Sequence, residues 1–280
     1  MGSIIPIANQ KGGVGKTTTA VNLAVCLAHY HAKRVLLVDL DLSCNATACL
    51  GYEAGSVGEA PLGHVISSVL SKQDQIPLSR AFLPTSIEGL TLIPGDRQIA
   101  THLPADYPFL LRETLAPVLA DYDVVLIDTP PSRSSITAHT YFAADWLIVP
   151  VECAPLALEG LADTIEMIQS YSRQRTSVRP DEFYRILKTK FDAREKISNT
   201  SIDRELAPFS EKVLGSVIRI NADLKHAQEH KVSIFHYHHG STGALDYFSL
   251  TREVLAYEEQ RHRDEAARTG QAAQDALAAG

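Results

Sequence analysis

Residues 9–19 read NQKGGVGKTTT and decide the fold. The apolar run at 3–8 before them predicts a strand, and apolar residues at helical spacing over 17–30 predict a helix. Glycines between a strand and a helix let backbone N–H groups turn inward around phosphate oxygens, and the helix N-terminus adds partial positive charge. The stretch therefore predicts a phosphate-binding loop for a nucleotide.

Each position of this loop has an expected role. Lys16 is expected to reach the β- and γ-phosphates, and the Thr17 hydroxyl to ligate Mg²⁺. Gln10 stands where the common pattern has glycine, and Lys11 is an additional lysine. The residues predicted to hold the nucleotide here are Gly12, Gly13, Val14, Gly15, Lys16, Thr17 and Thr18.

Carboxylates follow two further apolar stretches. Asp39 and Asp41 end the predicted strand at 34–40, where an acid could orient Mg²⁺ or an attacking water, or could simply cap the following turn. Asp128 ends VVLID at 124–128, which fits a Walker B acid in the Mg²⁺ shell. Pro130 and Pro131 stiffen the loop behind it, where a sensor of the γ-phosphate would lie.

Short apolar strands alternate with amphipathic helices along the chain. Strands are expected at 90–93, 146–151, 184–187 and 213–218, and helices at 108–120, 134–143, 156–173, 197–208 and 242–258. This alternation predicts an α/β fold, a doubly wound, mostly parallel sheet flanked by helices, of the P-loop NTPase type. Residues 51–104 are expected to form an irregular insertion. We predict one domain over 1–257 and a polar, helical or disordered tail over 258–280.

Composition excludes several classes of protein. No apolar run among the 280 residues reaches the ~18–20 needed to cross a bilayer, and the four cysteines lack C-x-x-C spacing. The net charge of −7 excludes a uniformly basic coat. Positive charge is segregated, because residues 173–219 hold eleven Lys/Arg against seven Asp/Glu. That segment is the best candidate for contact with DNA, although a solvated helical face is the simpler interpretation.

With these motifs placed, the chain resembles the ParA/Soj/MinD family of deviant Walker A ATPases, and most closely its ParA partition branch. The resemblance rests on the loop, on RVLLVDLD followed by NAT, and on YDVVLIDTPPS. It is supported by ALEG at 157–160, KTKFDAREKIS, GSVIRIN and GSTGALDYFSLTREVL.

The resemblance implies a role for each matching residue. Lys11 matches the signature lysine that reaches the partner's nucleotide in an ATP-sandwich dimer, and Lys16 matches the P-loop lysine. Asp41 matches the acid that positions the hydrolytic water. Catalytic roles therefore fall on Lys11, Lys16 and Asp41, and metal binding on Thr17, Asp39 and Asp128. Asp192 and Asn221 lie in strings that resemble those flanking the adenine pocket.

The resemblance also implies a function. ATP and Mg²⁺ would bind, two copies would close into a homodimer, and the dimer would bind DNA without sequence specificity. A ParB-type adaptor would stimulate slow hydrolysis, and cycling would segregate a plasmid or chromosome in a cytoplasmic, nucleoid-associated protein. Because the loop begins at residue 9, no operator-binding helix-turn-helix domain is expected before it.

Two departures from the family pattern concern the loop and the DNA contacts. After the second strand the family shows D-P-Q-G-N-A-T, and this chain has Asp41-Leu-Ser-Cys-Asn-Ala-Thr, which puts the hydrolysis rate in question. The family's arginines flanking Asn near 217–224 do not match fully. The residues proposed to contact DNA are Arg194, Lys196, Arg204, Arg219 and Lys225.

Two alternatives remain open. A ParA-like ATPase could position another cargo with a different adaptor, or the chain could be a nucleotide-gated scaffold that barely hydrolyses ATP. Membrane cycling is disfavoured, because the tail lacks the apolar face of an amphipathic membrane helix. His236 and His238 would share one face of a strand, but with no acid or cysteine cluster near them a surface loop is favoured over a metal site.

Overall fold

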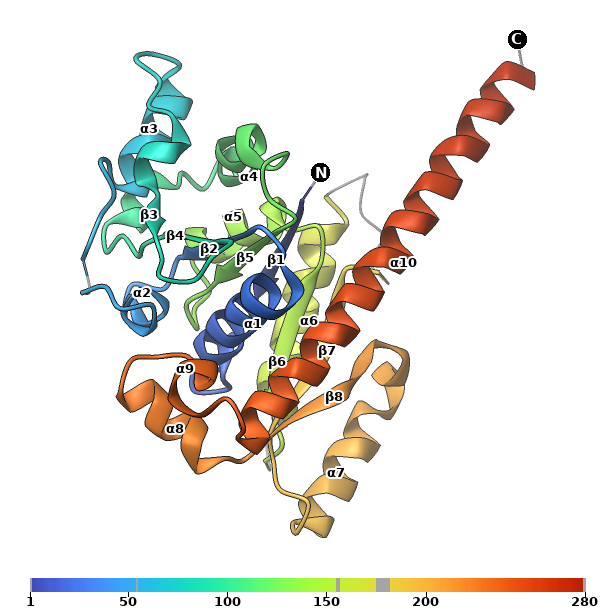
Figure 1. Cartoon of the computed structure of the whole chain (residues 1–280). Coiled ribbons are helices and arrows are strands. Elements are labelled where there is room, and N and C mark those ends of the chain that lie inside the picture. Colours follow the sequence, from blue (N-terminus) through green and yellow to red (C-terminus); the bar gives the residue numbers. More distant parts are fainter. Residues whose placement is uncertain (1, 54, 155–156, 175–181, 279–280) are drawn as a thin grey trace.

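In the computed structural model the described residues are 2–53, 55–154, 157–174 and 182–278, and they form one eight-stranded sheet (Figure 1). The strand order is β3-β4-β2-β5-β1-β6-β7-β8. Every pairing is parallel except that of β3 with β4. The strands are β1 (Ser3–Ile7), β2 (Val35–Asp39), β3 (Leu83–Pro84), β4 (Leu90–Ile93), β5 (Val124–Asp128), β6 (Leu147–Glu152), β7 (Tyr184–Phe191) and β8 (Val213–Arg219).

Helices cover both faces of the sheet. This explains why β1, β2 and β5 are buried at every residue and read as continuous apolar runs. Ile5 packs with α1 and α10 on one face, whereas Ile4 packs with α3, α4 and α5 on the other. The α-helices are α1 (Lys16–His31), α2 (Asn45–Cys49), α3 (Leu62–Ser71), α4 (Leu110–Leu115), α5 (Ser135–Ala143), α6 (Ala157–Ser172), α7 (Lys196–Leu206), α8 (Ala222–Glu229), α9 (Ile234–His238) and α10 (Thr242–Ala278).

The predicted doubly wound, mostly parallel α/β fold is confirmed, and several element boundaries differ from those expected. The helix expected at 108–120 is α4 followed by a 3₁₀ turn at Ala116–Val118, and α7 likewise gives way to 3₁₀ structure at Ala207–Lys212. A proline lies at the start of each 3₁₀ segment, where the missing N–H ends the α-helical hydrogen bonding. The segment 51–104 contains α3, β3 and β4 rather than irregular structure alone.

The longest helix is α10, with 37 residues, and it extends away from the sheet in Figure 1. It continues through residues 258–278, where the tail was expected to be helical or disordered. Glu258 explains part of this continuation, because its carboxylate is buried and accepts a 2.5 Å hydrogen bond from the indole of Trp146. The surface loop expected at His236 and His238 is instead the short helix α9, which begins after the capping hydroxyl of Ser233.

Candidate nucleotide site at the carboxyl edge of the sheet

The loop between β1 and α1 takes the shape that its glycines predict. Gly13 and Gly15 have φ of +75° and +92°, a backbone conformation that a side chain disfavours. Between them Val14 is buried, and its carbonyl accepts a 2.9 Å hydrogen bond from Thr189 Oγ1 at the end of β7. The loop is therefore fixed from a second strand while the glycines remain exposed or half-exposed.

Lys16 is the buried charge of this loop. Its side chain lies at the start of α1, and Nζ donates a 3.1 Å hydrogen bond to the Lys11 carbonyl. Burial lowers the pKa of Lys16, and the carboxylates of Asp128 and Asp41 act in the opposite direction. An ammonium held inside the loop without a direct carboxylate bond is placed to pair with an anion that enters it.

Asp128 and Asp39 lie side by side, because β2 and β5 pair in parallel with these two residues in register. Thr17 Oγ1 donates a 2.7 Å hydrogen bond to Asp128 Oδ2, whereas Asp128 Oδ1 is buried without a hydrogen-bond partner among the described residues. Burial and the adjacent Asp39 raise the pKa of Asp128. A buried carboxylate oxygen without a partner beside a threonine hydroxyl is a donor set that Mg²⁺ prefers, so the residues fit this ion.

Asp39 mainly holds the turn that follows β2. Its Oδ2 accepts hydrogen bonds from the Thr47 backbone N–H (2.8 Å) and hydroxyl (2.7 Å), and Oδ1 accepts from the Asp41 N–H at 3.2 Å. Burial raises the pKa of Asp39 to about 6. Asp39 therefore caps the turn after β2, as one of the two interpretations predicted. It could contribute to a metal site only together with the neighbouring Asp128.

Asp41 stands in the loop whose sequence departs from the family pattern. Its Oδ1 accepts hydrogen bonds from the Ser43 N–H (2.9 Å) and hydroxyl (2.8 Å), and the side chain is half-exposed. Cys44 takes the position of the family's glycine with φ of 54°, and its side chain is buried. A non-glycine residue in this conformation costs about 1–2 kcal/mol, so the loop tolerates the substitution with some strain.

The expected base-contacting residues have structural partners. Asp192 is bound by the guanidinium of Arg194 at 2.6 Å, which lowers its pKa to about 2. Asn221 caps α8, because its Oδ1 accepts from the Asp223 and Leu224 N–H groups, and its Nδ2 donates to Thr242 Oγ1.

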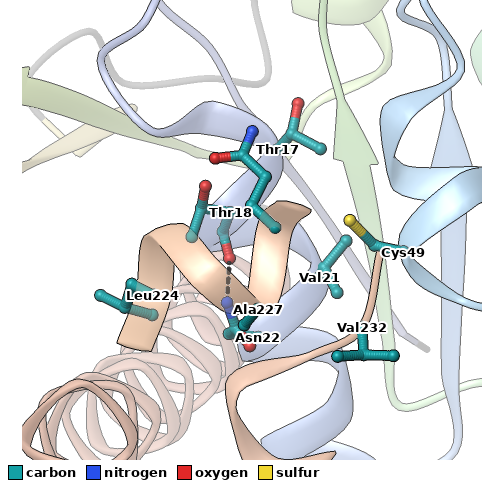
Figure 2. A pocket seen from close by; sticks show the side chains of 9 residues that line it. Thr17, Thr18, Val21, Asn22, Cys49, Leu224, Ala227 and Val232 are labelled. Atoms are coloured by element: carbon teal, nitrogen blue, oxygen red, sulfur yellow. Dashed lines mark hydrogen bonds between the residues drawn. The ribbon is translucent and has the colours of Figure 1, made fainter. Parts of the chain in front are cut away.

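A small cavity lies beside the loop, between the first turns of α1 and helix α8 (Figure 2). Thr17 and Thr18 line it from the phosphate side, and Leu224 and Ala227 line it from α8. Asn22 links α1 to α9, because Nδ2 donates to the Thr18 carbonyl at 2.8 Å and Oδ1 accepts from the Ile234 N–H at 2.8 Å. The sequence did not single out Asn22, whose only signal was its polar character inside an apolar stretch. Asn9 and Thr47 lie in the strings NQKGGVGKTTT and NAT, but no separate role was predicted for them.

The five proposed DNA-contacting residues fall into two groups. Arg194, Arg219 and Lys225 each form an ion pair, with Asp192, Asp246 and Glu229 respectively. Lys196 and Arg204 are exposed on α7 and form no ion pair within the part of the chain that the structure describes. The ALEG string at 157–160 opens α6, but its side chains lie outside the described residues.

A search of the described residues finds no helix with the length and apolar character to cross a membrane. The same residues contain no group of three or more His, Cys, Asp or Glu arranged to hold a metal. In α9, His238 pairs with Asp223 at 3.0 Å.

Comparison with known proteins identifies the family. Residues 2–179 match the family described as an AAA domain. The sporulation initiation inhibitor protein Soj of Bacillus subtilis is 38% identical over 264 residues, covering 91% of this chain and 99% of that protein. The chromosome-partitioning ATPase Soj of Treponema pallidum is 35% identical and is covered in full, with 93% of this chain aligned.

Solved structures agree with this relationship at the level of fold. Apo McdA from Cyanthece is 23% identical with a TM-score of 0.75, covering 91% of this chain and all of that one. Cobyrinic acid a,c-diamide synthase from Mycobacterium smegmatis, with bound ADP and magnesium, is 28% identical with a TM-score of 0.73, covering 92% and 96%. The chain thus belongs to the Soj/ParA family of chromosome-partitioning ATPases and is itself an ATPase.

Proposed function

We propose that this chain is a cytoplasmic, nucleoid-associated DNA-partition ATPase that works as an ATP-dependent homodimer. ATP with Mg²⁺ binds in the loop at 9–19, and two copies close face to face over their nucleotides. The closed dimer binds DNA without sequence specificity. A ParB-type adaptor stimulates hydrolysis, after which the dimer separates and releases the DNA.

The observation that carries the proposal is the arrangement of the two loop lysines. Lys16 is buried and directed into its own loop, whereas Lys11 is half-exposed and its side chain has no partner among the described residues. One lysine therefore serves the nucleotide of its own subunit, and the other is free to serve that of a second copy. A cation delivered in this way couples nucleotide state to dimerisation.

The remaining residues supply the chemistry of hydrolysis. Asp128 and Thr17, with Asp39 beside them, would hold Mg²⁺, which would supply positive charge against the developing phosphate charge. Asp41 positions the attacking water, and its ties to Ser43 fix its orientation at the edge of the site. Asp192 and Asn221 lie at the carboxyl ends of β7 and β8 and are assigned to the base side of the pocket.

DNA binding is assigned to the carboxyl ends of β7 and β8 and to α7 and α8. Lys196 and Arg204 are the principal contacts, because no acid in the described chain neutralises them. Arg194, Arg219 and Lys225 lie nearby with their charges already paired. A few such cations per subunit, doubled in a dimer, suffice for salt-sensitive binding to phosphates.

Light scattering with a non-hydrolysable ATP analogue and Mg²⁺ tests the proposal. We expect a dimer with the analogue, a monomer without it, and a monomer for Lys11→Ala under both conditions. Phosphate release is then measured with and without duplex DNA and adaptor. A wild-type chain that stays monomeric with the analogue contradicts the proposal, and a dimer whose hydrolysis neither DNA nor adaptor raises supports the scaffold alternative instead.

A further inference from the structure

Gln10, the residue before Lys11, forms side-chain hydrogen bonds that have no role in the proposed hydrolysis mechanism. Gln10 has both ends of its amide occupied: Nε2 donates to the Asp163 carbonyl at 3.0 Å, and Oε1 accepts from Arg133 Nε at 2.8 Å. Its orientation is therefore fixed by partners on two different elements. Asp163 belongs to α6, and Arg133 lies in the loop that follows Asp128.

Arg133 joins these two elements directly. Its second guanidinium nitrogen lies 3.4 Å from Asp163 Oδ1, and both side chains are 58% exposed. An exposed ion pair contributes little to stability, so we assign this arginine a positioning role rather than a stabilising one. The planar guanidinium presents donors in a fixed fork, and one such group sets the distance between the loop, Gln10 and α6.

The backbone of Lys11 is fixed on both sides. Its N–H donates to Asn9 Oδ1 at 2.9 Å, and its carbonyl accepts from Lys16 Nζ at 3.1 Å. Asn9 is itself held by the Pro150 carbonyl at 2.8 Å and by the Thr164 hydroxyl of α6 at 3.3 Å. The same Thr164 hydroxyl accepts from the Gln10 N–H at 3.3 Å.

The loop that contains Arg133 also approaches the phosphate loop, at Pro131. A side chain built on Gly12 would lie 4.0 Å from Pro131. Residues 129–134 follow the Walker B acid, and thus connect the end of β5 to the segment that holds Lys11. A shift in either this loop or α6 is transmitted to Lys11 through Gln10.

We propose that Gln10, held by Arg133 and Asp163, is a positioning residue that sets Lys11 for the second copy, so that the loop after Asp128 and helix α6 control dimer formation. This inference rests on the proposed function, because it assumes that Lys11 acts across the dimer. It assigns Arg133 no contact with the nucleotide. Arg133 acts through Gln10, and Gln10 acts through the backbone of Lys11.

The test measures two quantities for each variant: the affinity of the monomer for a fluorescent ADP analogue, and the protein concentration at which half is dimeric with a non-hydrolysable ATP analogue and Mg²⁺. For Arg133→Ala and for Gln10→Ala we expect the dimerisation midpoint to rise about five- to ten-fold, as for the loss of one or two modest hydrogen bonds. ADP affinity should stay within about two-fold of wild type, because the loop still closes on the diphosphate. Arg263→Ala, which changes an exposed arginine of α10 outside the basic segment, is the control and should change neither quantity.

The double variant Gln10→Ala/Arg133→Ala separates positioning from direct contact. If Arg133 acts through Gln10, the double variant should equal the single ones, whereas independent contacts would multiply their effects. Arg133→Lys should recover only part of the loss, since an ammonium cannot hold two partners in a fixed plane.

Three results overturn the inference: an unchanged midpoint in Arg133→Ala, an equal loss of ADP affinity and dimerisation, or multiplicative effects in the double variant. A wild-type chain that does not dimerise instead contradicts the proposed function, so the two failures are distinguished by the wild-type measurement.

Discussion

Two regions of the molecule place their charged side chains differently. One is the edge of the sheet around β1, β2 and β5, and the other is the basic segment at 173–219. At the first, Lys16, Asp39 and Asp128 are buried and hydrogen-bonded: Lys16 donates to the Lys11 carbonyl, and the two carboxylates accept from the threonine hydroxyls of α2 and α1. In the second, Arg194, Lys196, Arg204 and Arg219 are exposed, and Arg194 and Arg219 are bound by acids of the same chain.

This contrast separates two kinds of sequence signal. The strand, glycines and helix of a phosphate loop are contiguous in the chain, so the local sequence determines the shape of the loop. A cationic surface depends on which acids the fold brings beside each lysine or arginine. Asp246 lies 27 residues from Arg219 in the chain, yet it lies 2.5 Å from the guanidinium and is almost fully buried. Counting charges in a segment therefore overestimates the positive charge that remains available.

The largest expected effect is on the buried side of this comparison. Lys16→Ala should weaken nucleotide binding about 100-fold, because the loop loses a charged hydrogen-bond donor to the phosphates. Titration with a fluorescent ATP analogue measures it. Lys72→Ala, an exposed lysine after α3, is the control and should bind as the wild type. Unchanged affinity in Lys16→Ala would contradict the assigned role of the loop.

Asp41→Ala should separate binding from hydrolysis. The hydrolysis rate should fall about 100-fold or more, as for the loss of a group that positions the attacking water, while the ATP-bound dimer persists. Phosphate release and light scattering measure the two quantities. Ser43→Ala, which removes the hydroxyl hydrogen bond to the Asp41 carboxylate and keeps the one from the backbone N–H, should reduce the rate less. A normal rate in Asp41→Ala would show that another residue orients the water.

The buried acids predict a pH dependence of stability that surface charges do not. The pKa of Asp39 is raised to about 6, so its carboxyl group binds a proton more tightly in the ligand-free folded state than in the unfolded chain. The contribution of Asp39 to the free energy of unfolding is complete below pH ~4 and is lost as the pH rises through about 6. The free energy of unfolding falls by about 2–3 kcal/mol over this range. Chemical denaturation of wild type and Asp39→Asn across this range measures it. Parallel curves for the two proteins would show that Asp39 does not titrate in this range.

The smallest effects concern DNA, and they test the surface side directly. Lys196→Ala and Arg204→Ala should each lower the slope of log affinity against log salt by about 0.9, as for one phosphate contact. Arg194→Ala should lower it less, because Asp192 already neutralises that charge. Binding to random duplex over a salt series measures the slopes. Equal losses for all three variants would show that ion pairs within the chain do not limit DNA contact.

The residues of the nucleotide site could be found from sequence because their spacing is local. Gly13 and Gly15 adopt the left-handed backbone that glycine permits. Asp39 and Asp128 end adjacent parallel strands, as expected for an apolar run that is followed by an acid. The orienting residues could not be found in this way. Asn9 and Thr47 lie in strings that the sequence analysis used, but the contacts that give them an orienting role, like those of Thr164, form only after the chain folds.

The sequence by itself determined the alternation of strands and helices, the phosphate loop and the acids at the strand ends, because each depends on neighbouring residues and on the periodicity of burial. The tertiary structure alone decided that Asp39 is held by Thr47, that Arg219 is occupied by Asp246, and that Gln10 is tied to Arg133 and Asp163. These contacts depend on side-chain positions set by packing between distant segments, where a difference of one ångström decides whether a hydrogen bond forms.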